Sequence, residues 1–295
     1  MPTPPEITYH NIQLPLTNLH YLTCGQGPSL IVVPATISET NDWIGLLQFL
    51  GQKFTVYFFE LPGHHNSTPF EKPYSSDQVA ATVRHFMDAK QIRTTNIFGY
   101  SFGAILTLNI LDHIEERVDR VVFFAPAVAH YALNYSKVRK KFINHIVRFA
   151  SKPKRQQWLL EKLCHNEKVL DPAIKILDRL GKTRRRDERF KNRLLNLPLS
   201  TLNVLFYQME EIFSFDLAKL DKQYPHQVYF GMSVNDPLIH YNRTKKVLKS
   251  KFPNWQEIPF DYPFHQPPEP FTFDQLNADY YRLLNAVASE YQERS

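Results

Sequence analysis

Apolar residues in this chain occur either in short continuous runs or at helical spacing, and the two patterns alternate along the sequence. A continuous apolar run bounded by turn residues is typical of a strand buried on both faces of a parallel sheet. Four such runs stand in the first half of the chain, at Ser29 to Val33, Phe54 to Phe59, Thr95 to Phe98 and Arg120 to Phe124. Helical spacing separates them, at Asp42 to Leu50 with Asn41 as its cap, at Asp77 to Lys90, and from Phe102 to near Val118. This alternation predicts right-handed crossovers and a parallel sheet covered on both faces.

The two ends of the chain extend this sheet. Ile7 to Leu14 and Asn18 to Thr23, joined through Pro15, predict a strand hairpin at a sheet edge. Near the other end, the sequence predicts a strand at Gln227 to Gly231, a helix through Lys245 to Lys251, a strand at Trp255 to Pro259 and a closing helix from Phe273 to Tyr291. The predicted fold class is therefore α/β, with a mainly parallel central sheet of about eight strands and helices on both faces.

The alternation stops after Ala127 for about a hundred residues. Amphipathic helices are predicted there instead, around Val138 to Val147, around Trp158 to Leu170, from Ile174 to Gly181 and from Leu202 to Phe213. We therefore expect a core made of residues 1–128 and 223–295. Residues 129–222 would form a helical lid (cap), inserted after the sixth strand and placed over the mouth of the sheet.

Basic residues are concentrated in this insertion. Residues Ser136 to Arg193 contain 19 Lys and Arg against 6 Asp and Glu, a net charge of +13. The rest of the chain has a net charge of −7, which gives +6 for the whole. A basic segment on a mildly acidic body attracts anionic head groups, such as phosphorylated carriers or acidic lipids, and allows peripheral contact with a membrane. The same composition is also typical of a solvated face that keeps a protein soluble.

Composition narrows the class of protein. The 295 residues are 43% apolar, enough for one large packed domain, and contain no run of about eighteen apolar residues that would span a membrane. The N-terminus lacks the basic start and apolar stretch of a secretory signal. Cys24 and Cys164 are the only cysteines, and their spacing suggests neither a disulfide framework nor a metal site. We expect a cytoplasmic protein with no metal and no organic cofactor, because a glycine-rich phosphate loop with lysine is missing too.

The most specific motif is a Gly-x-Ser-x-Gly sequence formed by Gly99, Ser101 and Gly103, between the strand that ends at Phe98 and the helix that starts at Phe102. In so sharp a turn, the positions two residues either side of the serine have no room for a side chain, which explains both glycines. The turn projects the Ser101 hydroxyl above the sheet edge, where N–H groups of the new helix face any negative charge that develops. Ser101 is the candidate nucleophile, although a glycine-flanked turn with an idle serine has the same pattern.

This order of elements, with Ser101 after a middle strand and a helical insertion after the next, resembles the α/β-hydrolase superfamily, in particular the branch whose insertion forms a lid. The resemblance covers nearly the whole chain outside the lid. The superfamily has an acid after the strand that follows the lid and a histidine after the last strand, and those places hold Asp236 and His265 here. The resemblance therefore implies a catalytic triad of Ser101, Asp236 and His265, in the chain order that the superfamily uses.

These three residue types suit acyl transfer. A serine hydroxyl is a weak nucleophile until an imidazole removes its proton, and a carboxylate behind the imidazole fixes its tautomer and stabilises the imidazolium. Taken singly, the aspartate of an Asp-Pro pair is usually a turn residue, and a loop histidine is usually an ordinary surface residue. Their joint occurrence at matching strand ends favours the catalytic interpretation.

The oxyanion that develops during acyl transfer needs two N–H donors. The geometry of the serine turn assigns the first to the backbone of Phe102. The resemblance assigns the second to the turn after Val33, where the family usually has His-Gly before the donor. This chain has Pro34 and Ala35 there, so the donor would be Thr36.

Other positions also depart from the family's pattern. Glu60 replaces Asp, and His65 replaces the second Gly, in the family's Asp-x-Pro-Gly-x-Gly motif after the fourth strand; the position of His65 favours positive φ. Phe264 replaces the usual glycine before the histidine, and the whole chain has nine glycines. These departures indicate a diverged member. His64 and His65 are further candidates for the site, although loop histidines are usually structural or solvated.

The leading prediction is a lidded serine hydrolase that cleaves an ester or thioester of a small acyl substrate, anionic or lipid-like, through an acyl-enzyme. Esterases, thioesterases, lipases, amidases, carbon–carbon bond hydrolases and acyltransferases share this machinery, and the motifs do not separate them. Serine at the elbow argues against dehalogenase and epoxide-hydrolase chemistry. The missing glycines leave open a non-catalytic ligand-binding protein of the same fold. Nucleic-acid binding is not expected, because no nucleic-acid motif accompanies the basic segment.

Overall fold

The computed structural model describes residues 2–36, 39–150, 196–267 and 269–292. Its centre is an eight-stranded sheet with the strand order β1-β2-β4-β3-β5-β6-β7-β8. The strands are β1 (Ile7–Gln13), β2 (Asn18–Cys24), β3 (Ser29–Val33), β4 (Thr55–Phe59), β5 (Thr95–Tyr100), β6 (Val118–Phe124), β7 (Gln227–Ser233) and β8 (Trp255–Phe260). The pairs from β4 to β8 are parallel, and the β1–β2 hairpin joins them antiparallel through β2 and β4. The predicted fold class and the edge position of the hairpin are confirmed.

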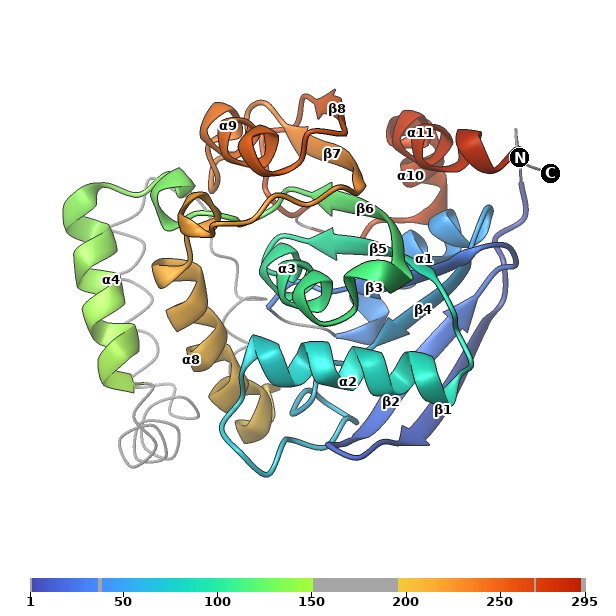
Figure 1. Cartoon of the computed structure of the whole chain (residues 1–295), viewed down its shortest axis with the longest axis horizontal. Helices are drawn as coiled ribbons and strands as arrows, with labels where there is room; N and C mark the ends of the chain where they lie inside the picture. Colours follow the sequence, from blue (N-terminus) through green and yellow to red (C-terminus); the bar gives the residue numbers. More distant parts are fainter. Residues whose placement is uncertain (1, 37–38, 151–195, 268, 293–295) are drawn as a thin grey trace.

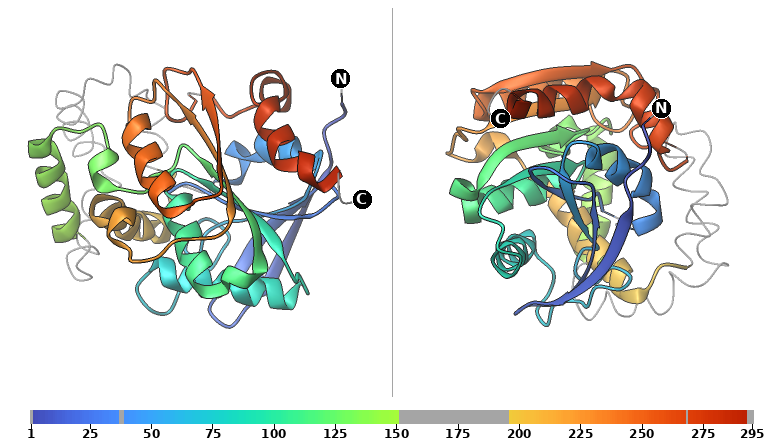
Figure 2. Two further views of the ribbon diagram at one scale, coloured as in Figure 1. Left: turned by 45° about the horizontal axis from the view of Figure 1, so that its top comes forward. Right: turned by 90° about the vertical axis from the view of Figure 1, so that its right-hand side faces the viewer.

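The continuous apolar runs form the middle of the sheet because helices cover both of its faces. All six residues of β5 are buried, and four of the five in β3. The helices of the core are α1 (Ile44–Gly51), α2 (Ser76–Ala89), α3 (Gly103–Ile114), α9 (Tyr241–Lys251), α10 (Phe273–Asp279) and α11 (Tyr281–Gln292). In Figures 1 and 2, α2 and α3 lie side by side on one face, whereas α1, α10 and α11 lie on the other. Each face of the sheet is therefore sealed by its own layer.

The first helix of the core starts later than the sequence predicts. Residues Thr40–Asp42 form a short 3-10 turn, so Asn41 lies inside that turn and the predicted cap at Asn41 is wrong. Trp43 occupies the N-cap position and its side chain makes no capping hydrogen bond. The indole is instead buried, with its ring 5.4 Å from Phe58 and 5.5 Å from Tyr100. Burial of this large side chain, rather than a polar cap, sets the start of α1.

One further helix end and the continuity of the closing helix also differ from the prediction. The helix after Ser101 ends at Ile114, and a 3-10 turn leads into β6, which begins at Val118. The closing helix is interrupted at Tyr280, which separates α10 from α11. Tyr280 is only 3% exposed, and its ring packs 4.8 Å from Phe260. Tertiary packing of an aromatic side chain outweighs the continuous helical pattern there.

The described residues between β6 and β7 contain helices but no strand of the sheet. They include α4 (Lys137–Ala150) and α8 (Leu199–Ser214), which correspond to the first and fourth helices predicted for the insertion. The second and third, around Trp158 and from Ile174, lie outside the described residues. Figure 1 shows α4 and α8 beyond the carboxyl ends of the parallel strands. None of the helices described has both the length and the apolar character needed to cross a membrane.

A carboxylate joins α8 to the core. Glu211 accepts a hydrogen bond from the Ser76 N–H at 3.1 Å and a second, short one from the Ser76 hydroxyl. Ser76 is the first residue of α2, so Glu211 satisfies a backbone N–H that the helix itself leaves without an acceptor. Burial raises the pKa of Glu211.

Candidate active site

Ser101 lies on a strained turn at the carboxyl end of β5. Its φ is +52°, in the left-handed region that non-glycine residues rarely adopt and that costs about 1–3 kcal/mol. Two backbone hydrogen bonds hold it there: the Ser101 N–H donates to Phe124 O at 2.9 Å, and its carbonyl accepts from the Ala127 N–H at 3.0 Å. The neighbouring strand β6 and the residues after it therefore fix the direction of the Ser101 side chain.

The two glycines of the motif allow close packing around this turn. A Cβ on Gly103 would lie 2.3 Å from the carbonyl oxygen of Val33 and 2.7 Å from that of Pro34. A Cβ on Gly99 would lie 2.5 Å from Thr107 Oγ1. The start of α3 thus lies directly against the turn after β3, which is the turn that carries Thr36.

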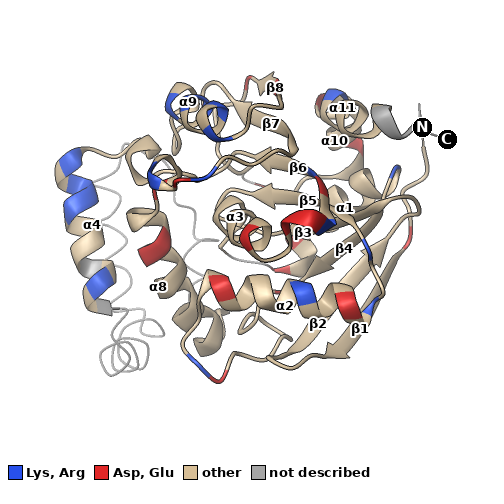
Figure 3. Cartoon of the chain, viewed as in Figure 1, with Lys and Arg blue, Asp and Glu red and all other residues tan. Residues whose placement is uncertain are grey.

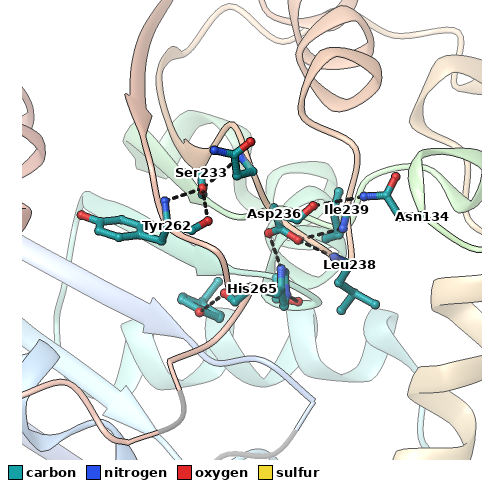
Figure 4. A network of polar contacts seen from close by, with 10 residues as sticks. Asn134, Ser233, Asp236, Leu238, Ile239, Tyr262 and His265 are labelled. Atoms are coloured by element: carbon teal, nitrogen blue, oxygen red, sulfur yellow. Dashed lines mark hydrogen bonds and ion pairs between the residues drawn. The ribbon is translucent and has the colours of Figure 1, made fainter. Parts of the chain in front are cut away.

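The structure brings Ser101, His265 and Asp236 together. Ser101 Oγ lies 2.8 Å from Nε2 of His265. Nδ1 of His265 lies 2.7 Å from Oδ2 of Asp236 (Figure 4). These distances suit an imidazole that donates from Nδ1 to the carboxylate and accepts the serine proton at Nε2. The side chains of Asp236 and His265 are 1% and 12% exposed, so little water competes for these bonds.

Backbone groups fix the Asp236 carboxylate. The N–H groups of Leu238 and Ile239 each donate to Oδ1 at 2.8 Å, which leaves Oδ2 directed at His265. The Asn134 side chain, from the segment after β6, donates to the Asp236 carbonyl oxygen at 3.1 Å. The aspartate is therefore both the turn residue expected of Asp-Pro and the partner of the imidazole.

A serine outside the motif joins the loop of the acid to that of the histidine. Ser233 Oγ donates to Tyr262 O at 2.6 Å and accepts from the Tyr262 N–H at 2.8 Å (Figure 4). It also accepts from the Asn235 N–H at 3.1 Å. Sequence reasoning missed Ser233 because a serine at a strand end has no distinctive pattern.

Tyr100, the residue before the candidate nucleophile, is hydrogen-bonded to the loop that carries His265. Its hydroxyl donates to the His265 carbonyl oxygen at 2.8 Å. Burial, with a smaller effect of the Asp236 carboxylate, raises the pKa of Tyr100, so the phenol keeps its proton and remains a donor. Tyr100 has no distinctive sequence pattern, since a buried aromatic residue in a strand looks like ordinary core.

The two expected oxyanion donors are the backbone N–H groups of Phe102 and Thr36. Phe102 is the N-cap of α3, and its N–H donates to no acceptor among the described residues. Thr36 is half-buried at the end of the turn after β3, next to positions 37–38, which lie outside the described residues. Both donors remain predictions.

Glu60 has a structural role at the end of β4. Its carboxylate accepts from Thr40 Oγ1 at 2.6 Å and from the Asn66 N–H at 2.8 Å. It therefore ties the segment before α1 to the loop after β4. This substitution of Glu for Asp keeps the carboxylate but uses the longer side chain to span the two loops.

The two loop histidines take different positions. His65 has φ of +39°, which confirms the predicted positive φ. His64 has no exposed surface, and burial, with a smaller effect of His65, lowers its pKa to about 3. A histidine that is held neutral inside the loop has a packing role. The backbone N–H of His65 donates to Thr201 Oγ1 of α8 at 3.4 Å.

Cys24, the cysteine within the described residues, is not a competing nucleophile. Burial raises the pKa of Cys24 to about 11, so its thiol stays protonated and is a poor nucleophile near neutral pH. Within the ranges given above, no group of three or more His, Cys, Asp and Glu side chains is arranged to hold a metal ion.

Comparison with known proteins assigns the family. Residues 28–265 match the family of the alpha/beta hydrolase fold, and this range includes the elbow and the loops of Asp236 and His265. The chain belongs to this alpha/beta hydrolase fold family.

The curated proteins that this chain resembles have names of different activities. A pimeloyl-[acyl-carrier protein] methyl ester esterase of Nitrosomonas europaea is 24% identical over 37% of this chain and 42% of its own length. The dihydrolipoyllysine-residue acetyltransferase component of an acetoin cleaving system of Pseudomonas putida is 24% identical over 50% of this chain and 40% of its own length. The chain thus spans less than half the length of these curated relatives.

Solved structures agree in fold. A putative lipase of Acinetobacter baumannii superposes with a TM-score of 0.67 at 14% identity, covering 96% of this chain and 93% of the lipase. At this identity the likeness concerns the alpha/beta hydrolase fold alone. The family match and this solved structure therefore agree on the alpha/beta hydrolase fold.

Proposed function

We propose that this protein is a serine hydrolase that cleaves a carboxylic ester or thioester through an acyl-enzyme, with Ser101 as nucleophile, His265 as general base and Asp236 as its partner. The observation that carries the proposal is the continuous hydrogen-bond chain from Ser101 Oγ through His265 to Asp236, with distances of 2.8 and 2.7 Å. It is supported by the strained φ of Ser101, which backbone hydrogen bonds from two further segments maintain.

The proposed reaction has two halves. Ser101 Oγ attacks the carbonyl carbon while its proton passes to Nε2 of His265, and the tetrahedral oxyanion is held by the N–H groups of Phe102 and Thr36. Collapse breaks the bond to the leaving alcohol or thiol, which takes the proton from Nε2. Water then attacks the acyl-enzyme and loses its proton to Nε2 of His265. The bond between the acyl carbon and Ser101 Oγ breaks, Oγ takes the proton back from Nε2, and the carboxylic acid is released.

The proposal includes a cap over the site at residues 129–222. It is supported by the position of α4 and α8 beyond the carboxyl ends of the strands, where ligands of parallel sheets bind (Figure 1). α8 also packs on the loop after β4, because Thr201 Oγ1 donates to the Gly63 carbonyl oxygen at 3.2 Å. We propose that apolar side chains of this cap receive the acyl chain and that its basic residues attract anionic leaving groups.

The test is labelling with a fluorophosphonate probe, read by peptide mass spectrometry. The wild type should be labelled at Ser101, and Ser101→Ala and His265→Ala should lose the label. His113→Ala is the matched control, because His113 also pairs with a carboxylate, Asp77, at 2.7 Å but has no part in the site. A folded wild type that stays unlabelled, or His265→Ala labelled at the wild-type rate, would refute the proposal.

Acyl transfer to an acceptor other than water is the second candidate. The motivating observation is the similarity to a protein named as an acetyltransferase component. The acyl-enzyme would be common to both functions, so product analysis separates them. Release of free carboxylic acid at a rate that added alcohol or thiol acceptors do not change would identify hydrolysis.

A further inference from the structure

The segment that leaves β6 runs alongside the loop that carries the acid of the site. We call residues 128–134 the β6–α4 segment and residues 234–240 the acid loop. An antiparallel bridge joins Leu133 to Ile239. Two backbone hydrogen bonds of 2.8 Å flank this bridge, from the His240 N–H to the Ala132 carbonyl oxygen and from the Asn134 N–H to the Leu238 carbonyl oxygen. The two segments therefore form a short ladder directly beside the acid.

Asn134 holds the acid loop at two points, one on either side of Pro237. Its backbone N–H donates to the Leu238 carbonyl oxygen, and its side-chain amide donates to the Asp236 carbonyl oxygen at 3.1 Å (Figure 4). Pro237 has no N–H of its own to donate. The N–H groups of Leu238 and Ile239 in turn hold Oδ1 of Asp236. Asn134 therefore supports both the backbone of the acid and a residue that fixes its carboxylate.

The β6–α4 segment is itself held by three other elements. The Leu217 N–H, just after α8, donates to the Val128 carbonyl oxygen at 3.0 Å. Lys140 of α4 and Arg243 of α9 both donate to the Tyr131 carbonyl oxygen, at 3.2 and 3.1 Å. Figure 3 shows the basic bands on α4 and α9, the two helices that supply these cations. The segment that supports the acid loop is therefore fixed from several sides.

The Asn134 side chain has a directional role rather than a packing role. Asn134 is exposed, so it buries little surface of its own. The Asp236 side chain is 1% exposed and its Oδ2 lies 2.7 Å from Nδ1 of His265. A catalytic arrangement of this kind has to be held within about 0.5 Å of its productive geometry. A hydrogen bond to the backbone of the acid therefore acts on the contact that matters for the imidazole.

We propose that Asn134 is a positioning residue for the proposed triad, whose amide holds the Asp236 backbone so that the carboxylate stays in contact with Nδ1 of His265. The inference rests on the proposed function, because it takes His265 as the base. Asn134 reaches none of the reacting atoms and acts through Asp236. Without the amide, the carboxylate moves away from Nδ1, stabilises the imidazolium less and fixes the tautomer less well.

The rate of fluorophosphonate labelling at Ser101, measured over a range of pH, tests the proposal. Asn134→Ala should lower the maximal rate about fivefold, the effect of one lost hydrogen bond. It should also move the pH of half-maximal labelling about 0.3–0.5 units lower, because a carboxylate that has moved away holds the imidazole proton less tightly. Asn134→Leu should show the same two changes, since leucine keeps the size of the side chain but has no donor.

Asn254→Ala is the matched control. Asn254 is also exposed, and its side-chain amide donates to the Pro225 carbonyl oxygen at 2.9 Å, beyond the opposite end of β7. This variant loses the same kind of hydrogen bond as Asn134→Ala, but at a distance from the acid loop. Its labelling rate should stay within about twofold of the wild type, with the same pH of half-maximal labelling. Denaturant unfolding of both variants shows whether their stabilities are alike.

The Nδ1 proton of His265 gives a second readout that needs no activity. Shared with a carboxylate at 2.7 Å, it should resonate far downfield in the proton NMR spectrum, and His265→Ala should remove the signal. Asn134→Ala should move this signal upfield, whereas Asn254→Ala should leave it in place. If the wild type is not labelled, the proposed function fails, and this signal still decides whether Asn134 positions Asp236.

Four results would overturn the positioning role. They are an Nδ1 signal that Asn134→Ala leaves unchanged, a wild-type rate in Asn134→Leu, a lowered rate with no change in the pH of half-maximal labelling, or equal losses in Asn254→Ala. The second result would assign Asn134 to packing, and the third would assign it to stability alone.

Discussion

The Tyr100 hydroxyl donates a hydrogen bond to the backbone carbonyl of His265 at 2.8 Å. The residue before the proposed nucleophile therefore supports the loop that carries the proposed base. Tyr100 is itself held between aromatic rings, with Trp43 at 5.5 Å and Phe124 at 5.4 Å. The position of the imidazole thus depends on a strand residue, and not only on its own loop.

Removing this hydroxyl should slow the reaction of Ser101. We expect Tyr100→Phe to lower the rate of fluorophosphonate labelling about fivefold, because loss of a buried hydrogen bond costs ~1 kcal/mol and frees the His265 loop to move. Tyr57→Phe is the control, since the Tyr57 hydroxyl makes no hydrogen bond within the described chain. Equal labelling rates in wild type and Tyr100→Phe would show that the loop needs no such support.

Ser233 should matter for stability as well as for geometry. Ser233→Ala leaves the N–H groups of Tyr262 and Asn235 without their acceptor, so we expect the free energy of unfolding to fall by about 1–3 kcal/mol. Denaturant unfolding measures this change. Ser250→Ala removes a hydroxyl that bonds to the Val247 carbonyl one turn earlier in α9, and should change stability by less than about 0.5 kcal/mol. Similar effects from both substitutions would contradict the role of Ser233.

The close approach at Gly103 predicts a sharp steric effect. Gly103→Ala would place a methyl group 2.3 Å from the Val33 carbonyl oxygen, a backbone atom that cannot rotate away. We expect it to separate α3 from the turn after β3, to abolish labelling of Ser101, and to destabilise the fold by at least about 1–3 kcal/mol. Gly231→Ala meets the Phe124 ring at 3.0 Å, which can shift, and should retain labelling. Normal labelling of Gly103→Ala would mean that the elbow does not need this contact.

The buried histidine predicts a pH effect on stability. The pKa of His64 is about 3 in the folded protein, below its ordinary value of 6.5, so the unfolded chain binds a proton between these values and the folded chain does not. Its contribution to stability is complete above pH 6.5 and is lost as pH falls towards 3, by ~1.4 kcal/mol per pH unit. Wild type should therefore lose roughly 2–3 kcal/mol more than His64→Gln between pH 6 and pH 4.

The test compares how steeply the free energy of unfolding changes with pH in the wild type and in His64→Gln. Glu211 has a raised pKa and opposes the trend at acidic pH, but it is present in both proteins and its effect cancels in the difference. Thermal unfolding at several pH values gives both slopes. If the stabilities of wild type and His64→Gln fall in parallel, His64 is protonated in the folded state.

The elbow could be predicted from sequence because its causes are local. Gly99, Ser101 and Gly103 lie within five residues. Because an apolar strand precedes them and an apolar helix follows them, the pattern specifies a single turn geometry. The strand at Ser29–Val33 was predictable for a similar reason, since every one of its core positions is apolar. The meeting of Asp236 with His265 required the order of the whole sheet, which the resemblance to a family supplied.

The supporting contacts could not be predicted in this way. Tyr100 and His265 are 165 positions apart, and Ser233 and Tyr262 are 29 apart, so no periodicity of the sequence relates them. Trp43 and Tyr280 alter the bounds of helices because their rings are buried by residues from distant segments. The middle of the predicted lid, residues 151–195, lies outside the described residues, so its helices and its cluster of charges remain predictions.

The bond between Glu211 and Ser76 has a consequence for exchanging parts between related enzymes. A carboxylate from the segment between β6 and β7 completes the first turn of α2, a helix from earlier in the chain. A chimera that replaced this segment with that of another hydrolase would leave the Ser76 N–H without its acceptor and the positive end of α2 without this carboxylate. Transplanted segments should therefore be chosen to carry an acidic side chain where Glu211 stands, or be paired with a new cap beside Ser76.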